Sequence, residues 1–175
     1  MNKYILSILV ENHPGALSKM AGLFTRRGYN IDSLTVSITD DPSISRMTIV
    51  VSGDEQITEQ IVKQLNKLVD VIKILELSPE KSISREVALI KVTLDQSTRS
   101  FIIETVNIFK CNIVEMNVKS IIIEITGDEE KVSSFIELMR PYGIKEIVRT
   151  GLAVLQRRSE DWKSTRLNSS HQYYL

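Results

Sequence analysis

The sequence predicts an α+β fold in which a strand–helix–strand–strand–helix–strand unit occurs twice in tandem. Apolar residues recur with a period of two, typical of strands, or about 3.6, typical of helices, in the same order in both halves. A polar segment with a proline, at residues 79–83, separates the halves. A Gly-Asp-Glu motif, at residues 53–55 and 127–129, closes a strand and opens a helix in each half. The motif favours an internal duplication, although Asp at a helix start also caps free amides and can arise independently.

The first predicted strand, at residues 4–10, is almost wholly apolar and too short for a core helix. We therefore expect a central strand that is buried on both faces. A helix follows, because apolar residues recur at helical spacing over residues 17–24 and Gly28 supplies a left-handed end. The period then changes to two over residues 34–38 and 47–51, which predicts a hairpin.

A second helix at residues 57–68 and a fourth strand at residues 71–77 complete the first unit. This order of elements is the ferredoxin-like arrangement, with one layer of helices on one face of an antiparallel sheet. The other face still carries apolar residues, so it needs a partner surface. The second half repeats the order, with strands at residues 87–94, 113–118, 121–125 and 144–148 and helices at residues 101–109 and 132–139.

These patterns divide the chain into a first domain at residues 1–78, a linker at residues 79–83 and a second domain at residues 84–158. Residues 159–175 have no sustained period. We expect this tail to be disordered or not to be native sequence.

The composition excludes several classes of protein. Hydrophobic residues make up 42% of the 175 and charged residues 25%, as in ordinary globular proteins. The 22 basic and 22 acidic side chains cancel, so no basic excess attracts nucleic acid. Cys111 is the single cysteine, which excludes an intramolecular disulfide and fits a reducing compartment. No apolar stretch is long enough to span a membrane and no signal-peptide pattern is present, so we expect a cytoplasmic protein.

Few residues of the chain could carry bond chemistry. Two histidines, His13 and His171, and one cysteine cannot supply a zinc site, and no phosphate-binding glycine motif occurs. We therefore expect no catalytic residue and no metal ligand.

Two alternative functions share the predicted topology. An acylphosphatase-like enzyme needs an arginine beside the loop at residues 11–15, which has none. An RNA-binding domain exposes aromatic residues on its central strands, and residues 46–51 contain none.

The turn at residues 12–15 is the strongest candidate binding site. Pro14 suits the first position of a helix, Asn12 is placed to cap that helix, and Gly15 lets a ligand approach the backbone closely. The first amides of the helix carry partial positive charge, which favours a carboxylate. The alternative is a well-formed helix start that binds nothing.

Asn30 lies where the first helix ends and the next strand begins, where asparagine is also a common turn residue. An amino-acid ligand needs acceptors for its ammonium group, and the side-chain oxygens of Asn12 and Asn30 could provide them. The strand at residues 30–39 is a predicted sheet edge. Pairing with the same edge of a second copy would protect it and form a pocket with Asn12 from one copy and Asn30 from the other.

Four runs of residues resemble the small subunit of acetolactate synthase (acetohydroxyacid synthase). They are Glu-Asn-His-Pro-Gly-Ala-Leu-Ser at residues 11–18, Arg-Gly-Tyr-Asn-Ile-Asp-Ser-Leu-Thr-Val at residues 27–36, Ser-Arg-Met-Thr at residues 45–48 and Gln-Leu-Asn-Lys-Leu-Val-Asp-Val at residues 64–71. The likeness spans residues 2–158 and is strongest in the first half. It implies an amino-terminal ACT domain, a regulatory module that binds amino acids between paired copies, followed by a second ferredoxin-like domain.

The resemblance also implies a function in valine, leucine and isoleucine biosynthesis. A small subunit of this family has no activity alone. It activates a large catalytic subunit, which carries thiamine diphosphate, Mg and FAD, and it confers feedback inhibition by valine or another branched-chain amino acid. We therefore expect three partners: a second copy through the ACT domain, the catalytic subunit and the amino acid.

Asn12, Gly15 and Asn30 match the effector-contacting positions of the family. Leu17 and Ile31 could form walls for a branched side chain, although both could equally be ordinary core residues. The expected effector-binding residues are Asn12, His13, Pro14, Gly15, Ala16, Leu17, Asn30 and Ile31.

Overall fold

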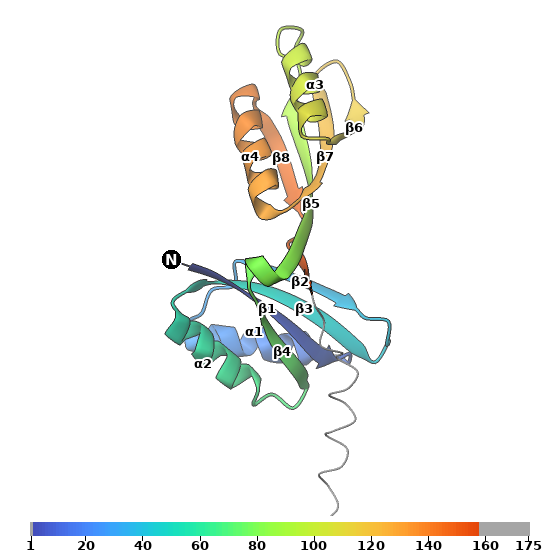
Figure 1. The fold of residues 1–175 in the computed structure, drawn as a ribbon. Coiled ribbons are helices and arrows are strands. Elements are labelled where there is room, and N and C mark those ends of the chain that lie inside the picture. Colours follow the sequence, from blue (N-terminus) through green and yellow to red (C-terminus); the bar gives the residue numbers. More distant parts are fainter. Residues whose placement is uncertain (1, 158–175) are drawn as a thin grey trace, which may run out of the picture.

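The computed structural model describes residues 2–157, so the expectation for the tail at residues 159–175 falls outside the described part of the chain. The predicted α+β architecture is confirmed: a four-stranded and a five-stranded antiparallel sheet each carry two helices on one face (Figure 1). None of the described helices has the length and apolar character needed to cross a bilayer.

The first sheet has the strand order β2-β3-β1-β4. Its neighbouring strands are all antiparallel, and α1 and α2 cover the same face of it (Figure 1). The first unit consists of β1 (Asn2–Glu11), α1 (Ala16–Arg27), β2 (Ser33–Ile38), β3 (Ile44–Gly53), α2 (Glu55–Leu65) and β4 (Val71–Leu77).

The second sheet has the order β6-β7-β5-β8, and a further strand, β9, pairs with the beginning of β5. The second unit consists of the 3-10 turn η1 (Pro79–Lys81), β5 (Ser82–Thr93), α3 (Arg99–Ile108), β6 (Asn112–Met116), β7 (Ser120–Gly127), α4 (Glu129–Met139), the 3-10 turn η2 (Arg140–Tyr142), β8 (Ile144–Arg149) and β9 (Ala153–Gln156).

Strand β1 is the central strand that its apolar sequence predicts. It pairs with β3 on one side and β4 on the other, and its residues 6–10 are buried on both faces of the sheet. Leu6, Ile8 and Val10 point toward the helices and are fully buried in the first core. The second core is built in the same way on β5, around Phe135 of α4.

The repeated Gly-Asp-Glu motif has the same structure in both units. Asp54 caps α2 by accepting the amide of Ile57 at 2.8 Å, and Asp128 caps α4 by accepting the amide of Lys131 at 2.9 Å. Such caps satisfy amides that have no partner within the helix. The predicted strand-to-helix transitions at both positions are therefore confirmed.

The outer face of the first sheet is partly covered by the chain itself. Leu152 and Val154, which follow β8 at the end of the second unit, pack against Val50 and Leu77 of the first sheet. Ile5 and Leu75 complete this junction cluster. The sequence indicates that this face needs a partner, but it does not reveal that the segment at residues 152–154 supplies one.

Strand β5 begins inside the range that the sequence predicts as linker. Ser82 and Ile83 lie in the strand, because β9 offers them a pairing partner: Ser82 pairs with Gln156 and Ile83 with Leu155. The non-strand connection between the two sheets is therefore only the short 3-10 turn η1 and Ser78.

We expect Leu152→Ala to destabilise the protein by about 2–4 kcal/mol, because it leaves a cavity in the junction cluster. Leu155→Ala is a matched control in the same segment, since Leu155 is 64% exposed and Leu152 only 5%. The control should change stability by less than about 0.5 kcal/mol. Urea unfolding followed by circular dichroism measures both, and equal effects would show that the junction cluster adds no stability.

Candidate functional site

The turn between β1 and α1 is built around Gly15. Gly15 is the capping residue of α1 and has a φ of 94°, in the left-handed region that glycine adopts without strain. The amide of Ala16 donates to the carbonyl of His13 at 3.3 Å, which closes a turn before the helix begins. The first helical bond runs from the Lys19 amide to the Gly15 carbonyl at 2.9 Å. The amides of Leu17 and Ser18 therefore precede the helical bonding pattern, as a carboxylate site requires.

Two details of the predicted helix start are wrong. Pro14 does not open the helix, because the extra turn closed by Ala16 delays the helix by two residues. Asn12 does not cap it either: its Nδ2 donates to the carbonyl of Pro42 at 2.9 Å, and its backbone amide donates to Ser43 at 2.8 Å. Asn12 thus ties the β1–α1 turn to the β2–β3 turn.

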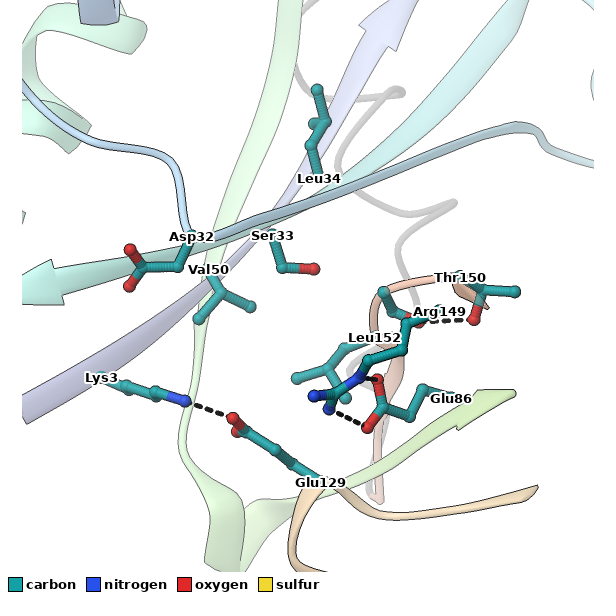
Figure 2. Close-up of a pocket in the computed structure, with 11 residues that line it drawn as sticks. Lys3, Asp32, Ser33, Leu34, Val50, Glu86, Glu129, Arg149, Thr150 and Leu152 are labelled. Atoms are coloured by element: carbon teal, nitrogen blue, oxygen red, sulfur yellow. Dashed lines mark hydrogen bonds and ion pairs between the residues drawn. The ribbon is translucent and has the colours of Figure 1, made fainter. Parts of the chain in front are cut away.

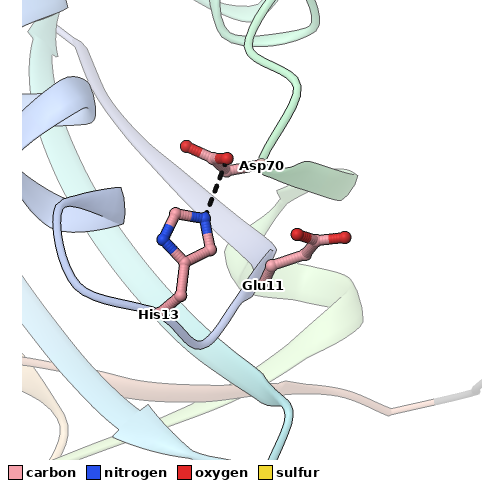
Figure 3. A group of neighbouring side chains, drawn as sticks. All are labelled: Glu11, His13 and Asp70. Carbon is pink, nitrogen blue, oxygen red and sulfur yellow. Dashed lines mark hydrogen bonds and ion pairs between the residues drawn. The ribbon is translucent and has the colours of Figure 1, made fainter.

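Helix α1 has no side-chain cap, and Asp70 anchors the turn through the side chain of His13 (Figure 3). Its buried carboxylate accepts from Nε2 of His13 at 2.9 Å and from Nζ of Lys19 at 2.8 Å. Its backbone carbonyl accepts the amide of Glu11 at 2.9 Å. Sequence reasoning missed this residue. The available signal in the sequence was that Asp70 follows two apolar residues directly before the predicted strand at residues 71–77.

These contacts shift both pKa values. Lys19, and after it His13, lowers the pKa of the Asp70 carboxyl. The carbonyl of Pro14, and after it the Asp70 carboxylate, raises the pKa of His13 above the ordinary 6.5. The turn therefore rests on an ionised aspartate between two basic side chains.

Glu11, His13 and Asp70 also form a group of candidate metal ligands, with ligand atoms within 4.8 Å of one another (Figure 3). The donor set does not suit a cation, however. Asp70 is already paired with His13, and the Lys19 ammonium lies 2.8 Å from its second oxygen, where it would repel a metal ion. The group is better described as an ion-pair network.

Asn30 lies beyond the other end of α1. Its Nδ2 donates to Oδ1 of Asp32 at 2.8 Å, and the Asp32 carboxylate also accepts a hydrogen bond from Ser52. Helix α1 has 12 residues and is about 18 Å long, so one chain does not bring Asn12 and Asn30 together.

Strand β2 forms an edge of the first sheet, as the sequence predicts. Within the described chain it pairs only with β3. Three of its apolar side chains, Leu34, Val36 and Ile38, are exposed. This edge therefore offers unpaired backbone groups beside an apolar strip, which is the kind of edge that proteins usually cover.

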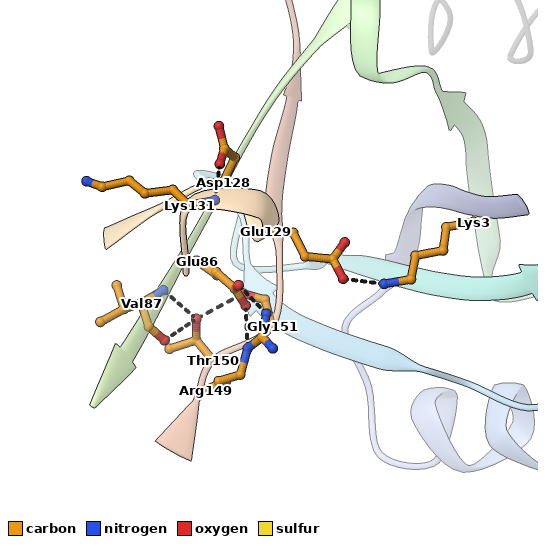
Figure 4. A network of polar contacts seen from close by, with 9 residues as sticks. All are labelled: Lys3, Glu86, Val87, Asp128, Glu129, Lys131, Arg149, Thr150 and Gly151. Atoms are coloured by element: carbon orange, nitrogen blue, oxygen red, sulfur yellow. Dashed lines mark hydrogen bonds and ion pairs between the residues drawn. The ribbon is translucent and has the colours of Figure 1, made fainter. Parts of the chain in front are cut away.

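A cavity of about 430 Å³ lies where the two units meet (Figure 2). Lys3 of the first sheet forms an ion pair with Glu129 of α4 across it. Arg149 binds the buried Glu86 with two hydrogen bonds, one of them 3.1 Å from Nε (Figure 4). Asp32 also lines this cavity, so the side chain that holds Asn30 is part of the junction wall.

The backbones of the two units come close at Gly151. A Cβ there would lie 2.7 Å from the hydroxyls of both Ser33 and Thr35, and φ is 81°. Thr35 Oγ1 donates to the carbonyl of Thr150 at 3.2 Å. Glycine at residue 151 therefore lets the segment after β8 contact β2 directly.

Comparison with known proteins decides the family. A model described as an "AHAS small subunit-like ACT domain" matches residues 6–73, and one described as "Small subunit of acetolactate synthase" matches residues 85–158. The "Acetolactate synthase small subunit" of Mycolicibacterium smegmatis is 49% identical over 154 residues, 88% of this chain and 91% of the relative. The chain belongs to the acetolactate synthase small-subunit family.

Two further relatives agree. The "Probable acetolactate synthase small subunit" of Archaeoglobus fulgidus is 53% identical over 155 residues, 89% of this chain and 97% of the relative. The crystal structure of an acetolactate synthase small subunit from Thermotoga maritima superposes with a TM-score of 0.83 at 41% identity, covering 91% of this chain and 99% of that one. The first unit is thus an ACT domain, and the chain is a non-catalytic, regulatory small subunit.

In the structure, the expected effector residues lie in two groups, one at each end of α1. Five of them lie in or beside the β1–α1 turn, with Ala16 buried, and Leu17 is 44% exposed on α1 rather than part of the core. Ile31 packs partly against the first core, next to the exposed Asn30.

Cys111 lies partly buried, and burial raises the pKa of its thiol to about 11, so it stays protonated.

We expect Gly15→Ala to destabilise the small subunit by about 1–2 kcal/mol. A Cβ at residue 15 meets no atom within 4 Å, so the cost comes only from the positive φ. Gly22→Ala is the matched control, because residue 22 lies inside α1 and its Cβ also meets nothing. There, alanine should stabilise by about 0.5–1 kcal/mol. Thermal unfolding measures both, and a stabilising Gly15→Ala would contradict the left-handed turn.

Proposed function

We propose that this regulatory small subunit binds valine or another branched-chain amino acid between two copies and thereby confers feedback inhibition on the catalytic subunit. The observation that carries the proposal is the position of Asn30, exposed at the opposite end of α1 from the Gly15 turn. Two half-sites that cannot meet in one chain can meet across a two-fold axis.

The ligand chemistry follows from the two half-sites. The α-carboxylate would accept from the first amides of α1, where the helix dipole favours negative charge. The α-ammonium would donate to the side-chain oxygens of Asn12 and, from the other copy, Asn30. A branched aliphatic side chain would contact Leu17 and Ile31. The proposed site consists of Asn12, His13, Pro14, Gly15, Ala16 and Leu17 of one copy with Asn30 and Ile31 of the other.

The β2 edge, which pairs only with β3 within residues 2–157, supports a homodimer through the ACT domain. Pairing two β2 strands would continue the sheet from one copy to the next and satisfy the backbone groups of both edges. It would also cover the exposed apolar strip formed by Leu34, Val36 and Ile38.

The domain junction offers a route from the effector to the second domain. A ligand bound to Oδ1 of Asn30 would act on a side chain whose Nδ2 donates to Asp32, and Asp32 lines the junction cavity together with Lys3 and Glu129. The ligand would thereby bias one of two arrangements of the domains. A coupling free energy of about 1–3 kcal/mol is enough for regulation.

The second domain, residues 84–158, or an outer sheet face would then act on the catalytic subunit. Thiamine diphosphate, Mg and FAD belong to that subunit in this proposal, and this chain holds no cofactor. Residues 1–78 would form the sensing domain, and Ser78 with η1 would connect it to the second domain. The assembly would work in the cytoplasm.

We expect Gly15→Asp to lower the affinity for valine about tenfold or more, a loss of about 1.4 kcal/mol, because it places a carboxylate beside that of the ligand. Gly15→Asn is the matched control, since it has nearly the same shape and tolerates a positive φ but carries no charge. Isothermal titration calorimetry measures both. Equal affinities in the two variants would refute the carboxylate position, and no heat with valine, leucine or isoleucine in the native chain would refute the effector assignment.

We expect Lys3→Met to weaken the inhibition of the catalytic subunit by valine while leaving valine affinity unchanged. Lys3 and Glu129 are half exposed, so the pair adds at most about 1 kcal/mol of stability and acts by orienting the domains. Lys63→Met is the control, because it breaks an exposed pair with Glu59 that lies within α2. Activity of the reconstituted enzyme against valine concentration is the measurement. If both variants keep full inhibition, the signal does not pass through this pair.

A further inference from the structure

We infer that Asp70 is a positioning residue of the effector site and acts through a protonated His13, so that effector binding is linked to proton binding. The inference rests on the proposed function, because it concerns the same turn at residues 12–15.

Both ring nitrogens of His13 face oxygen acceptors. Nδ1 lies 2.9 Å from the carbonyl oxygen of Pro14, and Nε2 lies 2.9 Å from Oδ1 of Asp70. A carbonyl and an ionised carboxylate have no proton to give, so each contact needs an N–H on the ring. A neutral imidazole carries only one N–H. The imidazolium form alone satisfies both contacts.

Charged groups from three elements face the ring. Asp70, before β4, and Glu11, at the end of β1, are negative, whereas Lys19 on α1 is positive and lies 2.8 Å from Oδ2 of Asp70. The Pro14 carbonyl and Asp70 raise the pKa of His13, and the charge of Lys19 opposes them. The net effect favours the protonated ring.

Asp70 is the fixed member of this network. It is buried, its backbone carbonyl accepts the Glu11 amide at 2.9 Å, and Lys19 holds its second oxygen. When His13 loses its proton, one of the two contacts loses its donor and a nitrogen lone pair faces an oxygen. The His13 side chain then keeps only one of its two hydrogen bonds to the turn and to Asp70.

The turn directs the amides that would bind the effector carboxylate, because the His13 carbonyl accepts the amide of Ala16. The carboxylate thus gains from the ordered turn and from the nearby positive charge. A raised histidine pKa contributes fully below about 6.5 and is lost as the pH rises through the folded-state value. Valine affinity should therefore fall as the pH rises. By linkage, bound valine should raise the pKa of His13 further.

The test is calorimetric titration of L-valine into the full chain at about pH 6 and about pH 8.5, together with an NMR titration of the imidazole signals. We expect the native chain to lose about fivefold or more in affinity across this range. His13→Gln should bind with an affinity that does not depend on pH. Asp70→Asn should lower the pKa of His13 and move the loss of affinity to lower pH.

Asp95→Asn is the matched control. Asp95 also stabilises a helix start, by accepting the amides of Ser97 and Thr98 at 2.8 and 2.9 Å, but it lies before α3 in the second unit. The Asp95→Asn variant should leave the pH dependence of valine affinity unchanged. The chain has one other histidine, so His171→Gln assigns the two imidazole signals.

The outcomes separate this inference from the proposed function. Valine binding that is independent of pH in the native chain, or an Asp95→Asn profile shifted as much as that of Asp70→Asn, overturns the proton linkage and leaves the effector site standing. No binding at any pH overturns both. If His13→Gln does not fold, the NMR titration of the native chain decides: a His13 pKa below about 6.5, or one that valine does not raise, overturns the inference.

Discussion

The pairing of one strand, β5, with three others determines how the two domains are placed. Its first residues pair with β9, and the rest pair with β7 and β8. This register brings Leu152 and Val154 onto Val50 and Leu77 of the ACT domain. Burial of each such side chain contributes about 1.5–3 kcal/mol, whereas the half-exposed Lys3–Glu129 pair contributes at most about 1 kcal/mol. Apolar packing therefore holds the domains together, and the polar contacts around the cavity select their orientation.

The effector turn depends on a second, smaller constraint. Helix α1 has no side-chain cap, and its start is held from outside by the buried carboxylate of Asp70. The amide of Ala16 closes the turn onto His13, and the amides of Leu17 and Ser18 come before the first helical bond, which the Lys19 amide makes. The same arrangement places charged groups beside the turn, because Asp70 binds the basic side chains of His13 and Lys19. The residues that support the turn, Asp70, His13 and Lys19, are thus also the ones that set the electrostatic potential at the proposed ligand site.

Much of the fold was predictable, because periods of two and about 3.6 are local properties of the chain. The central position of β1, the hairpin of β2 and β3 and the caps at Asp54 and Asp128 all follow from short segments. The details of the site were less accessible. Asn12 has the sequence context of a cap yet binds Pro42, since the chain reverses through the β2–β3 turn and brings a carbonyl within 2.9 Å. Asp70 and β9 gave no periodic signal at all.

The sequence by itself determined the order of the elements, the glycine at the left-handed turn and the motifs that identify the family. Each of these depends on residues that are neighbours along the chain. Only the tertiary structure decided that Asp70 supports His13, that Asn12 and Asn30 lie at opposite ends of α1, and that Asp32 connects Asn30 to the junction. The contacts at that junction join residues as far apart as 126 positions. Their partners are set by the path of the backbone, which no local pattern of residues encodes.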